Sequence, residues 1–192
     1  GIIAYKTFLH EAPEGRDAEF EGLTSANNDQ LYRVLEEVKK TGLAVAAHAE
    51  DNELVTGFIK RLREQGRQTE NIAHCESRPP IVEIEAISKM LKFGKDVGCP
   101  IELVHVSTWQ AMELAKKAKA EELQSLITEY KALNESDYTA NSWKALQESL
   151  TASANFLQVL NGDYTSTTVT EIEEKITNLK KAKDELKSAT VV

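Results

Sequence analysis

Apolar positions follow two different periods along the first 107 residues of the chain. Short apolar runs of strand length cover 2–9, 43–49 and 101–107. Between these runs, apolar residues recur at helical spacing over 28–42, 51–66 and 81–97. This β-α-β-α-β order predicts a parallel sheet with helical crossovers.

The pattern changes after the third run. An S-x-x-Q sequence at Ser107 is typical of a helix cap. From Trp109 to about Leu133, apolar residues recur at helical spacing and no proline or glycine interrupts them. Two further stripes follow Thr139 and Thr168, which we expect to cap helices. No strand-length apolar run occurs in this part. Three amphipathic helices joined by short polar loops predict an antiparallel bundle.

Composition also divides the chain near residue 120. All four histidines, all four prolines and both cysteines precede residue 106. We therefore expect two domains, 1–120 and 121–192, the first α/β and the second all-α. Cys75 and Cys99 do not share CxxC spacing, which favours free thiols in a reducing compartment.

Charge and hydropathy exclude several classes of function. The formal net charge of −8 argues against a nucleic-acid partner, which needs a clustered positive surface. No apolar run approaches the roughly 20 residues that span a bilayer. The first residues carry no positive segment or cleavage site typical of a signal peptide, so we expect no membrane partner.

Three residues stand out by their place in the predicted strands: Lys6, His48 and His105. The carboxyl ends of parallel strands in a βα-barrel open into one mouth, where these side chains would meet. A histidine in a strand is more often a hydrogen-bonded core residue than a metal ligand, and a lysine in an apolar strand can extend to solvent at a sheet edge. The spacing alone leaves the function undecided.

Four segments carry a resemblance to a known family: GIIAYKTFL, VAAHAED, HCESRPPIVEIEA and IELVHVS. Together they resemble the dihydropyrimidinase, hydantoinase, allantoinase and dihydroorotase group of cyclic amidohydrolases, over about residues 1–120. The resemblance implies a partial (β/α)8 barrel, zinc or another divalent metal, and a small cyclic amide substrate. It also implies that Lys6 is carboxylated and that Lys6, His48 and His105 bind metal.

The chain departs from that family's pattern in ways that bear on activity. It has no H-x-H pair, and it leaves the pattern before the strand that supplies the family's catalytic Asp. Glu11 stands where hydantoinases have a Tyr that helps to hold the substrate. We therefore assign no catalytic residue. We expect one half of a two-metal centre and no efficient turnover by this chain alone. We also expect self-association through exposed barrel edges, or a structure rearranged from the barrel.

Three other residues invite separate expectations. His74 lies on a predicted connector and is expected to be a structural or loop residue. Arg78 is expected to pair with Glu83 or Glu85, and His10 is expected to be exposed.

The C-terminal part resembles the FIVAR domain, a three-helix module of Gram-positive surface and carbohydrate-active proteins. The match covers about 121–190, and its most specific part runs from Asp137 to Trp143, D-Y-T-x-x-S-W. The resemblance implies a spacer or binding role, with Tyr138 and Trp143 anchoring helix packing. Three interpretations stay open: a cytoplasmic hydrolase fragment, a non-catalytic fusion, natural or engineered, of an incomplete barrel to a helical spacer, or a binding module led by the surface-type helical part.

Overall fold

A computed structural model describes residues 1–189, which fold as two compact units. The first unit is Gly1–Met112, and the second begins at Glu113. The last positions of the predicted second domain, 190–192, lie outside the described residues.

The first unit is built on a three-stranded parallel sheet. Its strands are β1 (Ala4–Phe8), β2 (Ala44–His48) and β3 (Ile101–Leu103), in the order β1-β2-β3. The predicted parallel sheet and its β-α-β-α-β order are confirmed. Val45 and Ala47 of the central strand are fully buried, as expected where a β-strand is paired on both edges.

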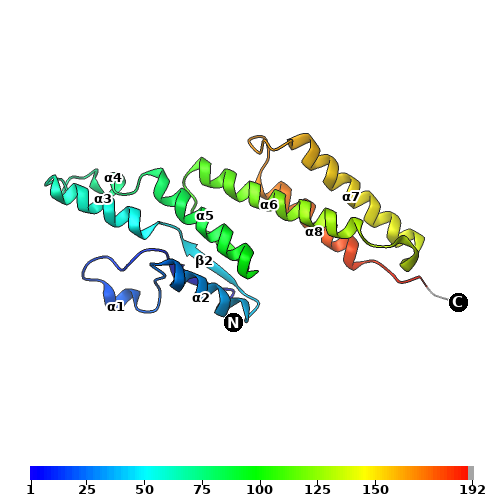
Figure 1. Ribbon diagram of the computed structural model, residues 1–192, viewed down its shortest axis with the longest axis horizontal. Helices are drawn as coiled ribbons and strands as arrows, with labels where there is room; N and C mark the ends of the chain where they lie inside the picture. Colours follow the sequence, from blue (N-terminus) through cyan, green and yellow to red (C-terminus); the bar gives the residue numbers. More distant parts are fainter. Residues whose placement is uncertain (190–192) are drawn as a thin grey trace. The chain divides into compact units, whose positions relative to one another are not determined.

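Five helices accompany the sheet: α1 (Asp17–Phe20), α2 (Asn28–Lys39), α3 (Asn52–Glu64), α4 (Ala73–Glu76) and α5 (Pro80–Val97). Figure 1 shows α2 and α5 beside β2, and these two helices share the core of the unit with the sheet. The side chain of Asn27 accepts from the amide of Gln30 and begins α2. Pro80 opens α5, and Gly98, in a left-handed conformation, ends it.

Burial of one helix face explains why α2 forms and stays docked. Leu31, Leu35 and Val38 lie one helical turn apart and are buried, as are Ile87 and Met90 of α5. Each such side chain contributes about 1.5–3 kcal/mol when it leaves water.

A close contact fixes β3 against α5. A Cβ atom added to Gly94 would lie 2.8 Å from Cγ2 of Ile101. Only glycine lets the helix approach the strand this closely.

The third strand is shorter than the sequence predicted. It ends at Leu103 instead of residue 107, because the backbone turns into a left-handed conformation at His105, where φ is 46°. The helix cap is also one residue later than predicted, since the hydroxyl of Thr108, and not that of Ser107, accepts from the amide of Ala111 at 3.4 Å.

The second unit consists of helices with their own core. Helix α6 (Trp109–Lys131) continues into it and is followed by a 3-10 turn (Glu135–Asp137), α7 (Ala140–Leu160) and α8 (Val169–Asp184). All three helices contribute to one cluster of buried side chains: Leu123, Ile127, Tyr130, Leu146, Leu150, Ile172, Ile176 and Leu179. Thr168, which was expected to cap a helix, begins α8 and forms a capping box with Glu171. Within residues 1–189, every helix is too short or too polar to cross a bilayer.

Candidate metal centre

The sheet of the first unit has two chemically different faces. Side chains alternate along a strand, and the register pairs Lys6 with Ala46 and Phe8 with His48. Thr7 and Ala47 belong to the opposite face, where α2 and α5 pack. Lys6, Phe8 and His48 therefore share the face that these helices leave open.

His48 and His105 meet at the carboxyl end of the sheet. Their ring centroids lie 4.8 Å apart. Strict alternation after Leu103 would have put His105 on the helix-covered face, because Leu103 pairs with Ala47. The left-handed turn at His105 redirects the chain, and its ring lies beside that of His48. A histidine adopts this conformation more readily than most residues do.

Lys6 lies on the same face but points to an aromatic ring. Its Nζ lies 5.3 Å from the centroid of Phe8, whose ring is 5.1 Å from that of His48. Lys6 is exposed. Partial desolvation still lowers its pKa, against the opposing effect of Glu102. A lower pKa increases the fraction of neutral amine.

Two further residues, His10 and Glu50, join this cluster. Their ligand atoms and one of His48 all lie within 4.8 Å of one another. Nε2 of His48 lies 3.5 Å from Oε2 of Glu50, and Nε2 of His10 lies 4.0 Å from the same oxygen. The expectation that His10 is exposed was wrong, since only 12% of its side chain is accessible. Packing against Phe8 and Phe20 encloses the ring.

Glu50 is held in its ionised form by two partners. Burial opposes ionisation, but the hydrogen bond from His48 and the charge of Arg78 lower the pKa of Glu50 to about 2. Nε of Arg78 lies 3.0 Å from Oε2 of Glu50. The predicted pairing of Arg78 with Glu83 or Glu85 was therefore wrong. Arg78 reaches a carboxylate 28 positions earlier in the chain, which no local pattern reveals.

Glu83 instead holds the segment that follows His105. Its two carboxylate oxygens accept from the amides and hydroxyls of Ser107 and Thr108, at 2.5–3.0 Å. Burial raises the pKa of Glu83, but these hydrogen bonds outweigh it and leave the pKa below its ordinary value. Glu83 thus ties the loop that carries His105 to α5.

Burial also determines the protonation of His10. Desolvation lowers its pKa, more than the hydrogen bond to the carbonyl of Glu11 raises it. The imidazole is therefore neutral at pH 7. Neutral imidazoles and a carboxylate are donors that zinc accepts, so this donor set fits a divalent transition metal.

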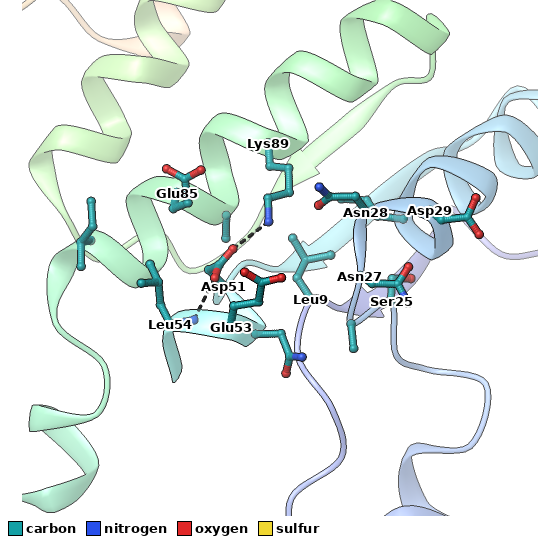
Figure 2. Close-up of a pocket in the computed structure, with 15 residues that line it drawn as sticks. Leu9, Ser25, Asn27, Asn28, Asp29, Asp51, Glu53, Leu54, Glu85 and Lys89 are labelled. Carbon is teal, nitrogen blue, oxygen red and sulfur yellow. Dashed lines mark hydrogen bonds and ion pairs between the residues drawn. The ribbon is translucent and has the colours of Figure 1, made fainter. Parts of the chain in front are cut away.

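A pocket of the first unit has no histidine in its lining. It has a volume of about 810 Å³ and is lined by the starts of α2 and α3 and by α5. Figure 2 shows Asp51 at its centre, where the carboxylate pairs with Nζ of Lys89 at 2.7 Å and accepts from the amide of Leu54 at 3.0 Å. Asp51 is only 7% exposed. The two opposite charges neutralise each other and Asp51 caps α3, so we interpret this ion pair as structural. The histidine cluster is therefore the better candidate for chemistry.

His74 takes no part in either place. It lies on the short helix α4, and its side chain is exposed.

Comparisons with known proteins bear on most of the chain. No protein-family model matches the chain. It is 37% identical over 119 residues to an allantoinase of Deinococcus radiodurans, covering 62% of this chain and 25% of the relative. It is 34% identical over 122 residues to an allantoinase of Enterococcus faecalis, covering 63% and 26%. A D-hydantoinase of Ralstonia pickettii is 29% identical over 140 residues, covering 71% and 28%.

Solved structures agree with these sequence comparisons. A D-hydantoinase crystal structure matches with a TM-score of 0.54 and 27% identity, over 64% of this chain and 24% of the other. The D-hydantoinase (dihydropyrimidinase) from Thermus sp. matches with a TM-score of 0.54 and 28% identity, over 63% and 24%.

Most of the chain is thus homologous to allantoinases and D-hydantoinases, and its partial sheet with helices corresponds to a fragment of the hydantoinase barrel fold. The chain spans about a quarter of the length of the curated relatives it matches.

Proposed function

We propose that the first unit carries one half of the metal centre of a cyclic amidohydrolase. In this proposal Lys6, His48 and His105 are the ligands of one divalent ion, zinc or another metal. The supporting observation is the 4.8 Å separation of the two imidazole rings at the carboxyl end of adjacent parallel strands. Lys6 lies on the same sheet face as His48.

The side chains have separate tasks in such a site. The two imidazoles bind through ring nitrogens. The neutral amine of Lys6 can add to the carbon of carbon dioxide as one C=O π bond opens, and it then loses a proton to water to give an anionic carbamate with oxygen ligands. The lowered pKa of Lys6 favours this step. Glu83 keeps the His105 loop in place through Ser107 and Thr108. A metal bound there would supply hydroxide near neutral pH.

We propose that the parent reaction is hydrolytic opening of a small cyclic amide of the allantoin, hydantoin or dihydropyrimidine type. The similarity to allantoinases, D-hydantoinases and a dihydropyrimidinase supports this substrate class. The chain by itself is not expected to turn over such substrates efficiently. The 192 residues contain no H-x-H pair to bind a second ion, and the resemblance to the family ends before the strand that supplies its catalytic Asp.

Metal content and hydrolysis test this proposal together. The purified 192-residue chain is expected to bind about one zinc with Lys6, His48 and His105 as ligands, and to hydrolyse allantoin or hydantoin slowly if at all. His48→Ala should remove both zinc and any residual hydrolysis. His74→Ala is the matched control, because that imidazole is exposed on α4. Activity that survives His48→Ala would refute the assignment, as would a chain that holds less than a tenth of a zinc.

A second candidate function concerns the helical unit. Its three helices share a core that needs no side chain from the sheet. Tyr138 and Trp143 stack with nearly parallel rings, 5.9 Å apart, which supports their role as packing anchors. We propose that residues 121–192 are a FIVAR-like spacer or binding module of the kind found on cell surfaces, whereas the hydrolase part is cytoplasmic in origin.

The spacer proposal predicts an independent fold. Residues 113–192 expressed alone should give a helical circular dichroism spectrum and a cooperative thermal transition. A fragment that is unfolded at 25 °C would contradict it.

Self-association is expected from the sheet of the first unit. Strands β1 and β3 are both edges, and the residue before β1, Ile3, is 89% exposed. The segment around Thr24 covers only the end of β1, at Phe8. Light scattering after size exclusion should therefore show dimers or larger species. A monomer at all concentrations would contradict this expectation.

A further inference from the structure

The geometry points to a cation site that does not use Lys6 or His105. We infer that His10, His48 and Glu50 bind a single zinc-like ion through two imidazole nitrogens and one carboxylate oxygen. This site shares only His48 with the centre proposed above. It goes beyond that proposal because the ion would be held without a lysine carbamate.

The separations of the ligand atoms are close to those that a metal needs. Zinc bonds of 2.0–2.2 Å in a tetrahedral arrangement place neighbouring ligand atoms about 3.3 Å apart. The distance from His48 to Glu50 is 3.5 Å and that from His10 to Glu50 is 4.0 Å. The three ligand atoms lie within 4.8 Å of one another. Rotations of the side chains alone can close the remaining gaps.

The backbone around His10 already orients its ring. Nδ1 of His10 lies 2.6 Å from the carbonyl of Glu11 and donates to it when the ring is neutral. The free lone pair is then on Nε2, which is the atom that faces Glu50. A backbone carbonyl commonly fixes a metal-binding histidine in this way. The amide of Glu11 is itself held by the side chain of Asn52 at 2.9 Å.

The three donors are partly shielded and come from neighbouring strand ends. Their side chains are 12% exposed for His10, 28% for His48 and 20% for Glu50. Arg78 also contacts Oε2 of Glu50, the oxygen nearest the two histidines, and its positive charge offsets part of the negative charge of Glu50. A carboxylate has about four lone-pair positions, so Glu50 can accept a hydrogen bond from Arg78 and bind a metal ion at the same time. A fourth position would be left to water, as in zinc sites with three protein ligands.

Zinc binding by a set of variants tests the inference. The chelator-treated 192-residue chain is titrated with Zn²⁺ in competition with a chromophoric zinc indicator. We expect one site per chain, weakened at least about tenfold by His10→Gln and by Glu50→Gln. His74→Gln is the matched control and should change the affinity less than about twofold, because that imidazole is exposed on α4 and a lost ligand would cost more than this. Lys6→Met and His105→Gln are titrated beside it to detect the centre proposed above. Circular dichroism of each variant checks that the fold is kept.

The outcomes separate the two proposals. If His10→Gln and Glu50→Gln bind zinc like the unsubstituted chain, the present inference is overturned. If Lys6→Met and His105→Gln are then the weakened variants, the amidohydrolase-type site stands and this one fails. Co²⁺ in place of Zn²⁺ gives a second readout, because Co²⁺ absorbs visible light when nitrogen and oxygen ligands hold it in a tetrahedral site. His10→Gln should abolish this absorption.

Discussion

The carboxylate of Glu83 on α5 provides the sharpest test of how the His105 loop is held. It accepts five close contacts from the amides and hydroxyls of Ser107 and Thr108. Glu83→Gln keeps the size of the side chain and replaces one oxygen by an amino group. That amino group would face the amide and hydroxyl of either Ser107 or Thr108, so two donors would meet.

The expected loss follows from the number of hydrogen bonds removed. A hydrogen bond to a charged group contributes about 1.5–3 kcal/mol in a shielded place. Glu83 is only partly buried, so solvent screening reduces each contribution to about 1 kcal/mol. Two lost bonds therefore lower the free energy of unfolding of the first unit by about 2 kcal/mol.

Hydrogen exchange measures this loss where it occurs. Peptides that cover 101–112 should exchange roughly 30-fold faster in the Glu83→Gln variant, which corresponds to about 2 kcal/mol of lost local protection. Glu85→Gln is the matched control, since Glu85 is an exposed carboxylate two positions away on the same helix. Equal protection of this segment in both variants would refute the role assigned to Glu83.

Three further predictions follow from other parts of the structure. Lys89→Met leaves the buried carboxylate of Asp51 unpaired and should lower the unfolding free energy by about 2 kcal/mol in urea denaturation, less than for a fully buried pair because Lys89 is 26% exposed. Glu50 has a pKa of about 2 in the folded chain and an ordinary value of 4.5. Its contribution to stability should therefore be complete above pH 4.5 and disappear as the pH falls through 2. The free energy of unfolding of Glu50→Gln should accordingly fall less than that of the unsubstituted chain between pH 4.5 and 2. Leu146→Ala removes a fully buried side chain and should cost about 2–5 kcal/mol in the unfolding of the helical unit, whereas Val159→Ala, at an 84% exposed position, should cost less than about 0.5 kcal/mol; similar values for the two would contradict the assigned core.

The candidate site was less predictable than the fold. The sequence placed Lys6, His48 and His105 near strand ends, and the structure brings the two histidines together. It did not identify His10 or Glu50, because their contacts join segments about 40 residues apart. The H-x-E spacing of His48 and Glu50 was the one local signal that could have indicated a ligand pair.

The sequence by itself determined the order of strands and helices in the first unit. Its apolar periods of two and 3.6 residues are local properties of the chain, and they marked α2, α3 and α5 within a few residues. The Thr168 and Glu171 cap could also be identified, because both partners of a capping box lie within four positions.

Only the tertiary structure decided where β3 ends and which charges pair. Glu83 accepts hydrogen bonds from the amides that follow His105, about 24 positions later in the chain. Arg78 pairs with Glu50 and not with the carboxylates that are nearer to it in the chain. Such choices depend on the distances between folded elements and on which groups are shielded from water. These quantities do not exist until the sheet and its helices have packed.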